Sequence, residues 1–225
     1  MTSSERMSRG VLLVAMALLP WLGVAQGWLG VDLGQSLRND WAWGLSTQIR
    51  SESAALSFNE VVSDASVRRT FDAVDGLAVD GQWRTGWEAP LEGGLLTSWR
   101  WATSVRYKHK VGDDALVFRV RRQWGGPWMR AWDNARWRTQ LRWVHDLPKG
   151  WKAIPSLEGF FRMAEGGSQA LRARIVLDKK LSKRRHISCG AQWQTSPSGP
   201  STTTVLCTYD WTLKKPKKPQ GDEPK

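Results

Sequence analysis

The nine residues RWRTQLRWV, Arg136–Val144, decide between two kinds of fold. Successive side chains of a strand point to opposite faces, so three arginines share one face and two tryptophans share the other. In a soluble protein the aromatic face would be the core. In a lipid bilayer the assignment reverses, because an outward arginine near the bilayer centre costs about 2–4 kcal/mol.

The same alternation recurs along the chain, in segments separated by short breaks rich in Gly, Pro, Asp and Ser. Clear alternation covers residues 41–50, 77–88, 95–108, 116–121, 136–144, 150–163, 171–177, 187–193 and 205–213. A tenth strand is expected within residues 51–76, where SVRRTFDAV ends at the tight-turn dipeptide Asp75-Gly76. Single-chain bacterial barrels have even strand counts. The sequence therefore predicts an all-β, antiparallel, up-and-down transmembrane β-barrel of about ten strands, within a range of eight to twelve.

The two ends of the chain differ from the barrel in composition. Residues 1–25 combine a short basic segment, an apolar run and a small-residue cleavage site, which predicts a signal peptide. Its removal lowers the formal net charge from +12 to +11. Residues 26–213 would form the barrel, and residues 214–225 a disordered basic periplasmic tail. The predicted location is the bacterial outer membrane.

Ten strands would bring both ends of the barrel to the periplasmic side. The breaks VDG, HKVGDD, HDLPKG and DKKLSKRR would then be periplasmic turns. The longest connection, about residues 51–65, would lie outside the cell, where the longer loops of such barrels usually lie.

The polar face of the strands is rich in arginine and would line the barrel interior. The predicted interior residues are Arg50, Arg100, Arg106, Arg119, Arg121, Arg136, Arg138, Arg142, Arg172 and Arg174, with Glu158 among them. The same face carries Arg84, Lys108 and Arg162, and few acids: Asp80, Glu88, Glu158 and Asp210. Such an interior either attracts small anions, as in a porin-like pore, or closes itself with arginine–carboxylate pairs. The predicted role is thus structural or weakly anion-conducting.

The opposite face carries tryptophans that would anchor the barrel at the membrane interfaces. The predicted anchors are Trp41, Trp43, Trp99, Trp101, Trp137, Trp143, Trp193 and Trp211. A soluble, exported, lipocalin-like binding protein would show the same alternation with these indoles as its core, and alternation alone does not exclude it.

Other chemistries have weaker support in the sequence. His186 and Ser188 share the inward face, and with Glu158 they supply the residue types of a Ser-His-acid hydrolase or acyltransferase acting on outer-membrane lipids. Enzyme activity is nevertheless not expected, because His186 lies beside a basic turn. No metal site, cofactor or nucleic-acid partner is expected either. The expected partners are outer-membrane lipids and small anions.

The two cysteines lie at equal distances from Ser198, in the middle of a turn. If a hairpin is centred there, Cys189 and Cys207 stand directly opposite each other on the outward face. Directly opposed residues in a non-hydrogen-bonded pair have Cα atoms about 4.5 Å apart, which is within disulfide range. We expect a cross-strand pair, either bonded or merely adjacent.

Four stretches together resemble a known family: WAWGLSTQIR, RWRTQLRWVHDLP, IPSLEGFF and LRARIVLDKKLSKRRHISCGAQWQ. Their order is similar to that of the outer-membrane barrel family named domain of unknown function 2490 (DUF2490). The positions that match are Trp41, Arg50, Arg136, Arg138, Glu158, Phe160 and either Arg172 or Arg174. The resemblance covers roughly residues 40–213 and implies a small outer-membrane barrel; the family has no assigned activity.

Overall fold

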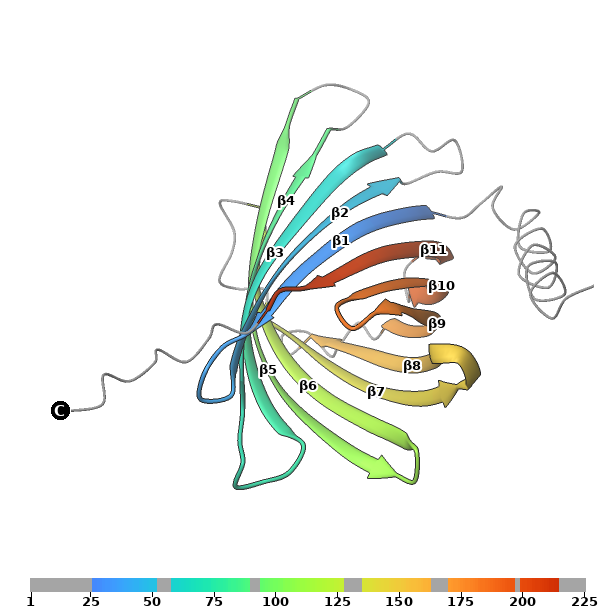
Figure 1. The fold of residues 1–225 in the computed structure, drawn as a ribbon. Coiled ribbons are helices and arrows are strands. Elements are labelled where there is room, and N and C mark those ends of the chain that lie inside the picture. Colours follow the sequence, from blue (N-terminus) through green and yellow to red (C-terminus); the bar gives the residue numbers. More distant parts are fainter. Residues whose placement is uncertain are drawn as a thin grey trace, which may run out of the picture.

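A computed structural model of the chain describes residues 26–51, 58–89, 94–127, 135–162, 170–196 and 199–214. The predicted signal peptide and residues 215–225 of the predicted tail lie outside these ranges. The described residues form eleven strands (Figure 1): β1 Gln26–Ser36, β2 Trp41–Ser51, β3 Phe58–Thr70, β4 Leu77–Glu88, β5 Leu96–Val111, β6 Asp114–Pro127, β7 Arg136–Leu147, β8 Trp151–Arg162, β9 Ala170–Ser182, β10 Arg185–Ser196 and β11 Gly199–Thr212. A 3₁₀ turn, Pro148–Gly150, follows β7. The described part of the chain contains no helix with the length and apolar character needed to cross a membrane.

The strands close into a barrel in which each strand pairs with its neighbours in sequence. All of these pairs are antiparallel except the closing pair, β1 and β11, which lie side by side and run parallel (Figure 1). Their register aligns Gln26 with Thr204 and Gly34 with Thr212. A barrel built only from hairpins closes in parallel when its strand number is odd, so eleven strands require this arrangement.

The predicted strand count of ten omitted β1. The expected additional strand between residues 51 and 76 is present as β3. Strand β1, QGWLGVDLGQS, contains three glycines spread over both faces, and its one tryptophan, Trp28, faces inward. Both features weaken the alternation on which the prediction relied.

The two ends of the barrel have different connections. At the short-turn end the strands are joined by residues 37–40, 71–76, 112–113, 148–150 and 183–184; at the long-loop end they are joined by residues 52–57, 89–95, 128–135, 163–169 and 197–198. The four breaks predicted to share one end do so, at the short-turn end. The expected connection of residues 51–65 is shorter, because β3 begins at Phe58.

The barrel begins and ends at opposite ends. Gln26 starts β1 at the long-loop end, whereas Thr212 completes β11 at the short-turn end. The prediction that residue 26 and the end of the barrel lie on the same side is therefore wrong, because β1 adds one more crossing.

Gly76 allows the tight turn between β3 and β4. Its φ of 82° lies in the left-handed region, which glycine adopts without a steric penalty. A Cβ at this position would lie 2.0 Å from the carbonyl oxygen of Lys108, because the amide of Lys108 donates a hydrogen bond to the Gly76 carbonyl. The turn predicted at Asp75-Gly76 thus requires glycine.

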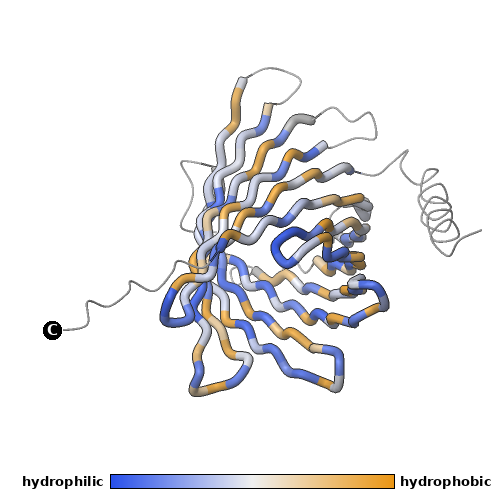
Figure 2. The backbone as a smooth tube through the Cα atoms, in the orientation of Figure 1, coloured by the Kyte–Doolittle hydropathy of each residue, from blue (hydrophilic) through white to orange (hydrophobic). Residues whose placement is uncertain are grey.

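The interior of the barrel is polar and its exterior is apolar. Among the described residues, the buried polar or charged side chains outnumber the buried hydrophobic ones; they are Ser51, Asp64, Asp80, Ser104, Arg121, Gln123, Glu158, Asp178, Gln192 and Thr204. Hydrophobic and hydrophilic residues alternate along the strands (Figure 2), and the large hydrophobic ones are exposed on the outside. The arginine-bearing face of Arg136–Val144 therefore points inward. An aromatic core, as in the lipocalin-like alternative, is not present in the described barrel.

The outward aromatic residues form two belts. One belt lies near the short-turn end and contains Trp41, Trp43, Trp143, Trp151 and Trp211; the other lies toward the long-loop end and contains Trp83, Trp87, Trp99, Trp101, Trp124, Trp137 and Trp193. Between them the outward positions are mainly aliphatic, including Leu45, Val105, Leu141, Leu157 and Ile175. An apolar band between two aromatic girdles is the usual exterior of a transmembrane barrel.

Candidate functional site

The barrel encloses a cavity of about 1110 Å³. Its lining reaches both ends of the barrel, from Ser36 and Thr212 at the short-turn end to Arg136 and Ala170 at the long-loop end. Eleven lining residues are arginines and only five are aspartate or glutamate. This excess gives the wall a positive potential, which attracts anions most strongly in a confined space with low-dielectric walls.

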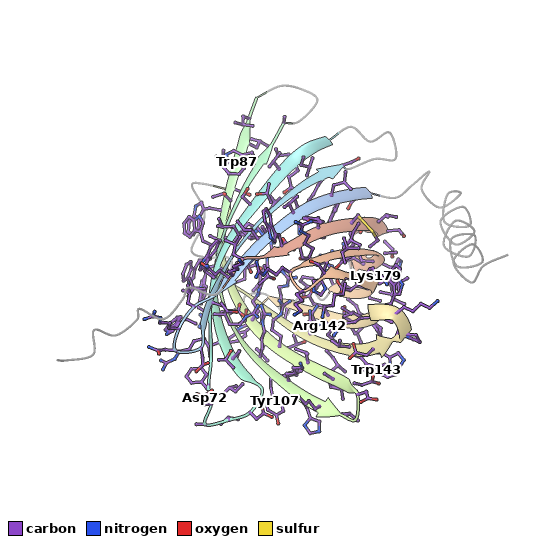
Figure 3. The ribbon with its side chains drawn as sticks, in the orientation of Figure 1. Asp72, Trp87, Tyr107, Arg142, Trp143 and Lys179 are labelled. Carbon is purple, nitrogen blue, oxygen red and sulfur yellow. A yellow bond between two sulfur atoms is a disulfide. The ribbon has the colours of Figure 1, made fainter. Side chains whose placement is uncertain are left out.

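Most of the residues predicted to line the interior lie on the cavity wall: Arg50, Arg100, Arg106, Arg119, Arg121, Arg136, Arg138, Glu158, Arg172 and Arg174. Arg84 lines the cavity as well. Arg142 lies inside the barrel, whereas its sequence neighbour Trp143 lies outside (Figure 3), but Arg142 is not part of the cavity wall. Lys108 is exposed near the short-turn end, and the side chain of Arg162 lies outside the described residues.

Glu158 on β8 is the centre of the largest ion-pair cluster. Its carboxylate accepts hydrogen bonds from the guanidinium groups of Arg119 at 3.1 Å, Arg138 at 2.9 Å and Arg172 at 3.3 Å. The side chain is only 3% exposed, so these three arginines supply the charge that its burial requires. Phe160, two residues along β8, lies under the guanidinium groups of both Arg138 and Arg172, at 4.7 and 4.8 Å from its ring centre. Three positive charges thus share one carboxylate.

Three other inward acids pair with arginines closer to β4. Arg84 binds Asp64 through two hydrogen bonds of 2.7 Å, a bidentate geometry that fixes the guanidinium plane. Asp80 forms ion pairs with Arg106 at 2.6 Å and with Arg121 at 3.7 Å. A looser pair of 3.3 Å joins Arg50 to Glu60.

Arginines also face other arginines. Directly opposed positions on neighbouring strands hold Arg84 and Arg100, Arg106 and Arg119, and Arg121 and Arg138. Like charges at opposed positions destabilise a sheet. Among the described residues, Arg100 forms no ion pair with an acid, and it interacts electrostatically with Arg50, Arg84, Arg136 and Arg138. We call these five residues the Arg100 cluster. A bound anion would relieve the repulsion in this cluster.

Several interior residues were missed from the sequence. Trp28 on β1 lies 4.3 Å from the guanidinium carbon of Arg50, and Asp32 on the same strand lines the cavity. Asp64 and Arg68 on β3 line it too. All four residues belong to strands that were either unassigned or only loosely placed, although the alternation of VVSDASVRR could have revealed the last two.

The residues of the hydrolase alternative do not come together. Ser188 donates hydrogen bonds to Asp178 at 2.8 Å and to Asp210 at 3.3 Å, while His186 contacts Asp178 at 3.1 Å. Asp178 thus lies between the serine and the histidine, whereas a catalytic triad needs the histidine to accept the serine proton. Glu158 belongs to the separate arginine cluster.

Asp32 and Asp210, near the short-turn end of the described interior, do not form a metal site. Asp32 lies directly opposite Asp210 across the parallel pair, and Asp210 lies opposite His186. Within the residues that the structure describes, no group of three or more His, Cys, Asp or Glu side chains could hold a metal ion.

Cys189 and Cys207 lie directly opposite each other on β10 and β11, with Cα atoms 4.2 Å apart, and are joined by a disulfide. Both side chains lie on the outward face. The hairpin register expected from their equal distance to Ser198 is the one observed, apart from a shift near the turn.

The predicted anchors all lie on the outward face of the strands: Trp41, Trp43, Trp99, Trp101, Trp137, Trp143, Trp193 and Trp211. Trp83 stacks on Trp99 with ring centres 5.3 Å apart. Two outward arginines accompany the belts: Arg69 lies over Trp41, and Arg122 lies over both Trp124 and Trp137. Guanidinium groups held against indoles near strand ends are typical of side chains that extend to a membrane interface.

Residues 25–204 match the family described as "Protein of unknown function (DUF2490)". The matched region includes β1, whereas the resemblance noted in the sequence begins only at about residue 40. No curated protein matches the chain.

Proposed function

Since this chain belongs to the DUF2490 family of proteins of unknown function, we propose its function from the geometry of its interior. It is a bacterial outer-membrane β-barrel that binds small anions along an arginine-lined cavity and conducts them weakly. The observation that carries this proposal is the cavity that reaches both ends of the barrel and is lined by eleven arginines against five acids.

The membrane location is supported by the inverted distribution of side chains. A closed barrel leaves no unpaired sheet edge in lipid, which satisfies the backbone requirement of a spanning protein. Exposed aliphatic residues lie between two aromatic belts, while buried positions are mainly polar. The start of the chain has the composition of an export signal, which gives a route out of the cytoplasm.

The short-turn end would face the periplasm and the long-loop end the cell exterior, as in other bacterial barrels. Single-cysteine variants in a background lacking Cys189 and Cys207 test this orientation with a membrane-impermeant maleimide on intact cells. Leu95→Cys, at the long-loop end, is expected to react. Asp113→Cys, in the turn between β5 and β6, should react only after the outer membrane is permeabilised. Equal labelling of both positions in intact cells would contradict the proposed location.

Anion preference is tested by the reversal potential of the purified protein in a planar bilayer under a KCl gradient. The wild-type protein is expected to favour chloride over potassium. Arg100→Gln removes a cation with no acid partner among the described residues, so the reversal potential should shift toward zero. Arg122→Gln is the matched control, because it removes the same charge from the outward face, beside Trp124 and Trp137.

The alternative is a structural interior in which the arginine–carboxylate pairs brace a closed barrel. It predicts no current from the wild-type protein and none after Arg136→Ala. Cation selectivity would also contradict the proposal. In either case the role of the ion pairs around Glu158 and Asp80 would be to support the barrel wall from inside.

A further inference from the structure

An apolar groove of about 650 Å³ crosses the outward face of the barrel from β6 to β11. It arises because Pro155, Ala173 and Ala191, on the adjacent strands β8, β9 and β10, are smaller than the residues around them. Ala173 lies between Leu157 and Trp193 in register, and Ile175 lies between Pro155 and Ala191. The outward residues of the groove are Leu116, Leu141, Trp143, Pro155, Leu157, Ala173, Ile175, Ala191, Trp193 and Thr203.

The same strands carry a dense group of cations at their short-turn end. Lys149, Lys179, Lys183, Arg184 and Arg185, which we call the basic patch, lie in or beside the turns that join β7 to β8 and β9 to β10. Lys183, Arg184 and Arg185 are exposed. The acids of these two hairpins are already paired, Asp146 with Lys152 and Asp178 with His186.

Elsewhere at the short-turn end the basic residues lie beside acidic turns. The turn between β3 and β4 contains Asp72 and Asp75, and the turn between β5 and β6 contains Asp113 followed by Asp114. Asp72 and Lys179 lie on well-separated parts of the barrel (Figure 3). An anionic partner would therefore be attracted most strongly to the β7–β10 side.

The groove and the basic patch are close enough for one molecule to occupy both. Ile175 in the groove and Lys179 in the patch are four residues apart on β9 and point to the same face, which corresponds to roughly 13 Å along the strand. Half the hydrocarbon core of a bilayer is about 15 Å thick. Lys179 lies over the ring of Trp151, 5.0 Å from its centre, so a cation and an indole meet where lipid head groups would lie.

We propose that this surface binds one anionic phospholipid of the periplasmic leaflet. The phosphodiester lies against the basic patch and one acyl chain fills the apolar groove. The inference rests on the proposed function in requiring that the outward face meets lipid and that the short-turn end faces the periplasm. Charge complementarity selects an anionic head group, and the continuous apolar groove selects a lipid over a free phosphate.

Native mass spectrometry of the detergent-purified protein tests the proposal, with phosphatidylglycerol and phosphatidylcholine as the added lipids. The wild-type protein should retain one phosphatidylglycerol in preference to phosphatidylcholine. Arg184→Gln/Arg185→Gln should weaken this preference by about tenfold, since each basic residue near the surface adds to the attraction of anionic lipid. Lys108→Gln/Lys110→Gln is the matched control, because it removes two exposed cations beside the turn between β5 and β6 and should leave retention unchanged.

Two further measurements separate the groove from the patch. Ala173→Phe fills the groove between Leu157 and Trp193, so it should lower retention of both lipids while leaving the preference for the anionic one. Glycerol phosphate, which carries the head-group charge without acyl chains, should not displace the bound lipid. Displacement by glycerol phosphate, equal retention of both lipids by the wild-type protein, or a second protein copy on this face would each overturn the proposal.

The outcome is distinguishable from failure of the proposed function. If Leu95→Cys and Asp113→Cys label as expected but lipid retention shows no preference, only this lipid site is wrong. If both positions label equally in intact cells, the membrane location is wrong whatever lipid the purified protein retains. If only Asp113→Cys labels, the orientation is reversed and the periplasmic leaflet is the wrong one.

Discussion

Leu45 and Ser46 are adjacent on β2, yet Leu45 is exposed on the outer surface while Ser46 faces the cavity between Asp32 and Asp64 in register. The two residues therefore lie at nearly the same height along β2 but face different surroundings, the outer surface and the cavity. Leu45→Arg should lower the free energy of unfolding in lipid by about 2–4 kcal/mol, because it places a charge in the apolar band.

Ser46→Arg is the matched change on the opposite face. Two carboxylates flank it, so the variant should refold into phospholipid vesicles as well as the wild-type protein. The measurement is the folded fraction, followed as the mobility difference between heated and unheated protein on gels. Equal loss in both variants would mean that the outer face does not meet hydrocarbon.

Glu158→Gln should destabilise the barrel strongly. The change leaves Arg119, Arg138 and Arg172 close together without their shared carboxylate. Removing one partner of a buried ion pair costs about 3–5 kcal/mol. Urea unfolding followed by tryptophan fluorescence measures the effect, and the variant should also show stronger anion selectivity than the wild-type protein.

The control for this prediction is Glu60→Gln. Glu60 forms a single, looser pair with Arg50 and its side chain is 31% exposed. Partial exposure to solvent weakens this pair, so the loss should be about 1 kcal/mol, well below that of Glu158→Gln. A similar cost for both variants would show that Glu158 is no more important to the interior than the more exposed inward acid Glu60.

Reduction of the Cys189–Cys207 disulfide should lower stability without opening the barrel. The two residues are separated by 18 positions in sequence, and closing a loop of this size contributes about 2–4 kcal/mol to stability. Unfolding curves with and without a reductant measure the difference. A Cys189→Ser/Cys207→Ser variant should behave like the reduced protein and should not respond to the reductant.

Gly76→Ala should be more harmful than Gly112→Ala, although both glycines have positive φ in short turns. An added Cβ at Gly112 meets nothing within 4 Å, so only the left-handed backbone cost of about 1–2 kcal/mol applies. At Gly76 the Cβ would collide with the Lys108 backbone, so the turn must also move. Thermal unfolding of the two variants compares them, and equal melting temperatures would count against the tight packing of the turn.

Strand parity was sufficient to predict the faces of most strands. Once an arginine is assigned to the interior, the period of two fixes every other residue of its strand, which is why Arg136, Arg138 and Arg142 could be placed together. Strand β1 escaped because glycine leaves both faces without a strong signal. That single omission also reversed the predicted position of residue 26 relative to the end of the barrel.

The acids that pair with the arginines were harder to predict than the face to which the arginine side chains point. Parity states that Glu158 points inward, but the convergence of arginines from β6, β7 and β9 on it depends on the relative stagger of four strands. The lengths of the loops at the long-loop end do not determine how β6, β7, β8 and β9 are staggered relative to one another. Asp64 and Asp32 were missed because their strands, β3 and β1, were poorly defined in the sequence.

Because a single parallel strand pair, β1 and β11, closes the barrel, we expect the barrel to open at that pair. Evenly spaced, slanted bonds hold β1 to β11 slightly less firmly than the antiparallel ladders hold the other strands. The disulfide also joins β11 to β10, so if β1 and β11 separate we expect β1 to be the strand that moves. These two strands are also the farthest apart along the chain, so we expect their pairing to form last when the barrel folds.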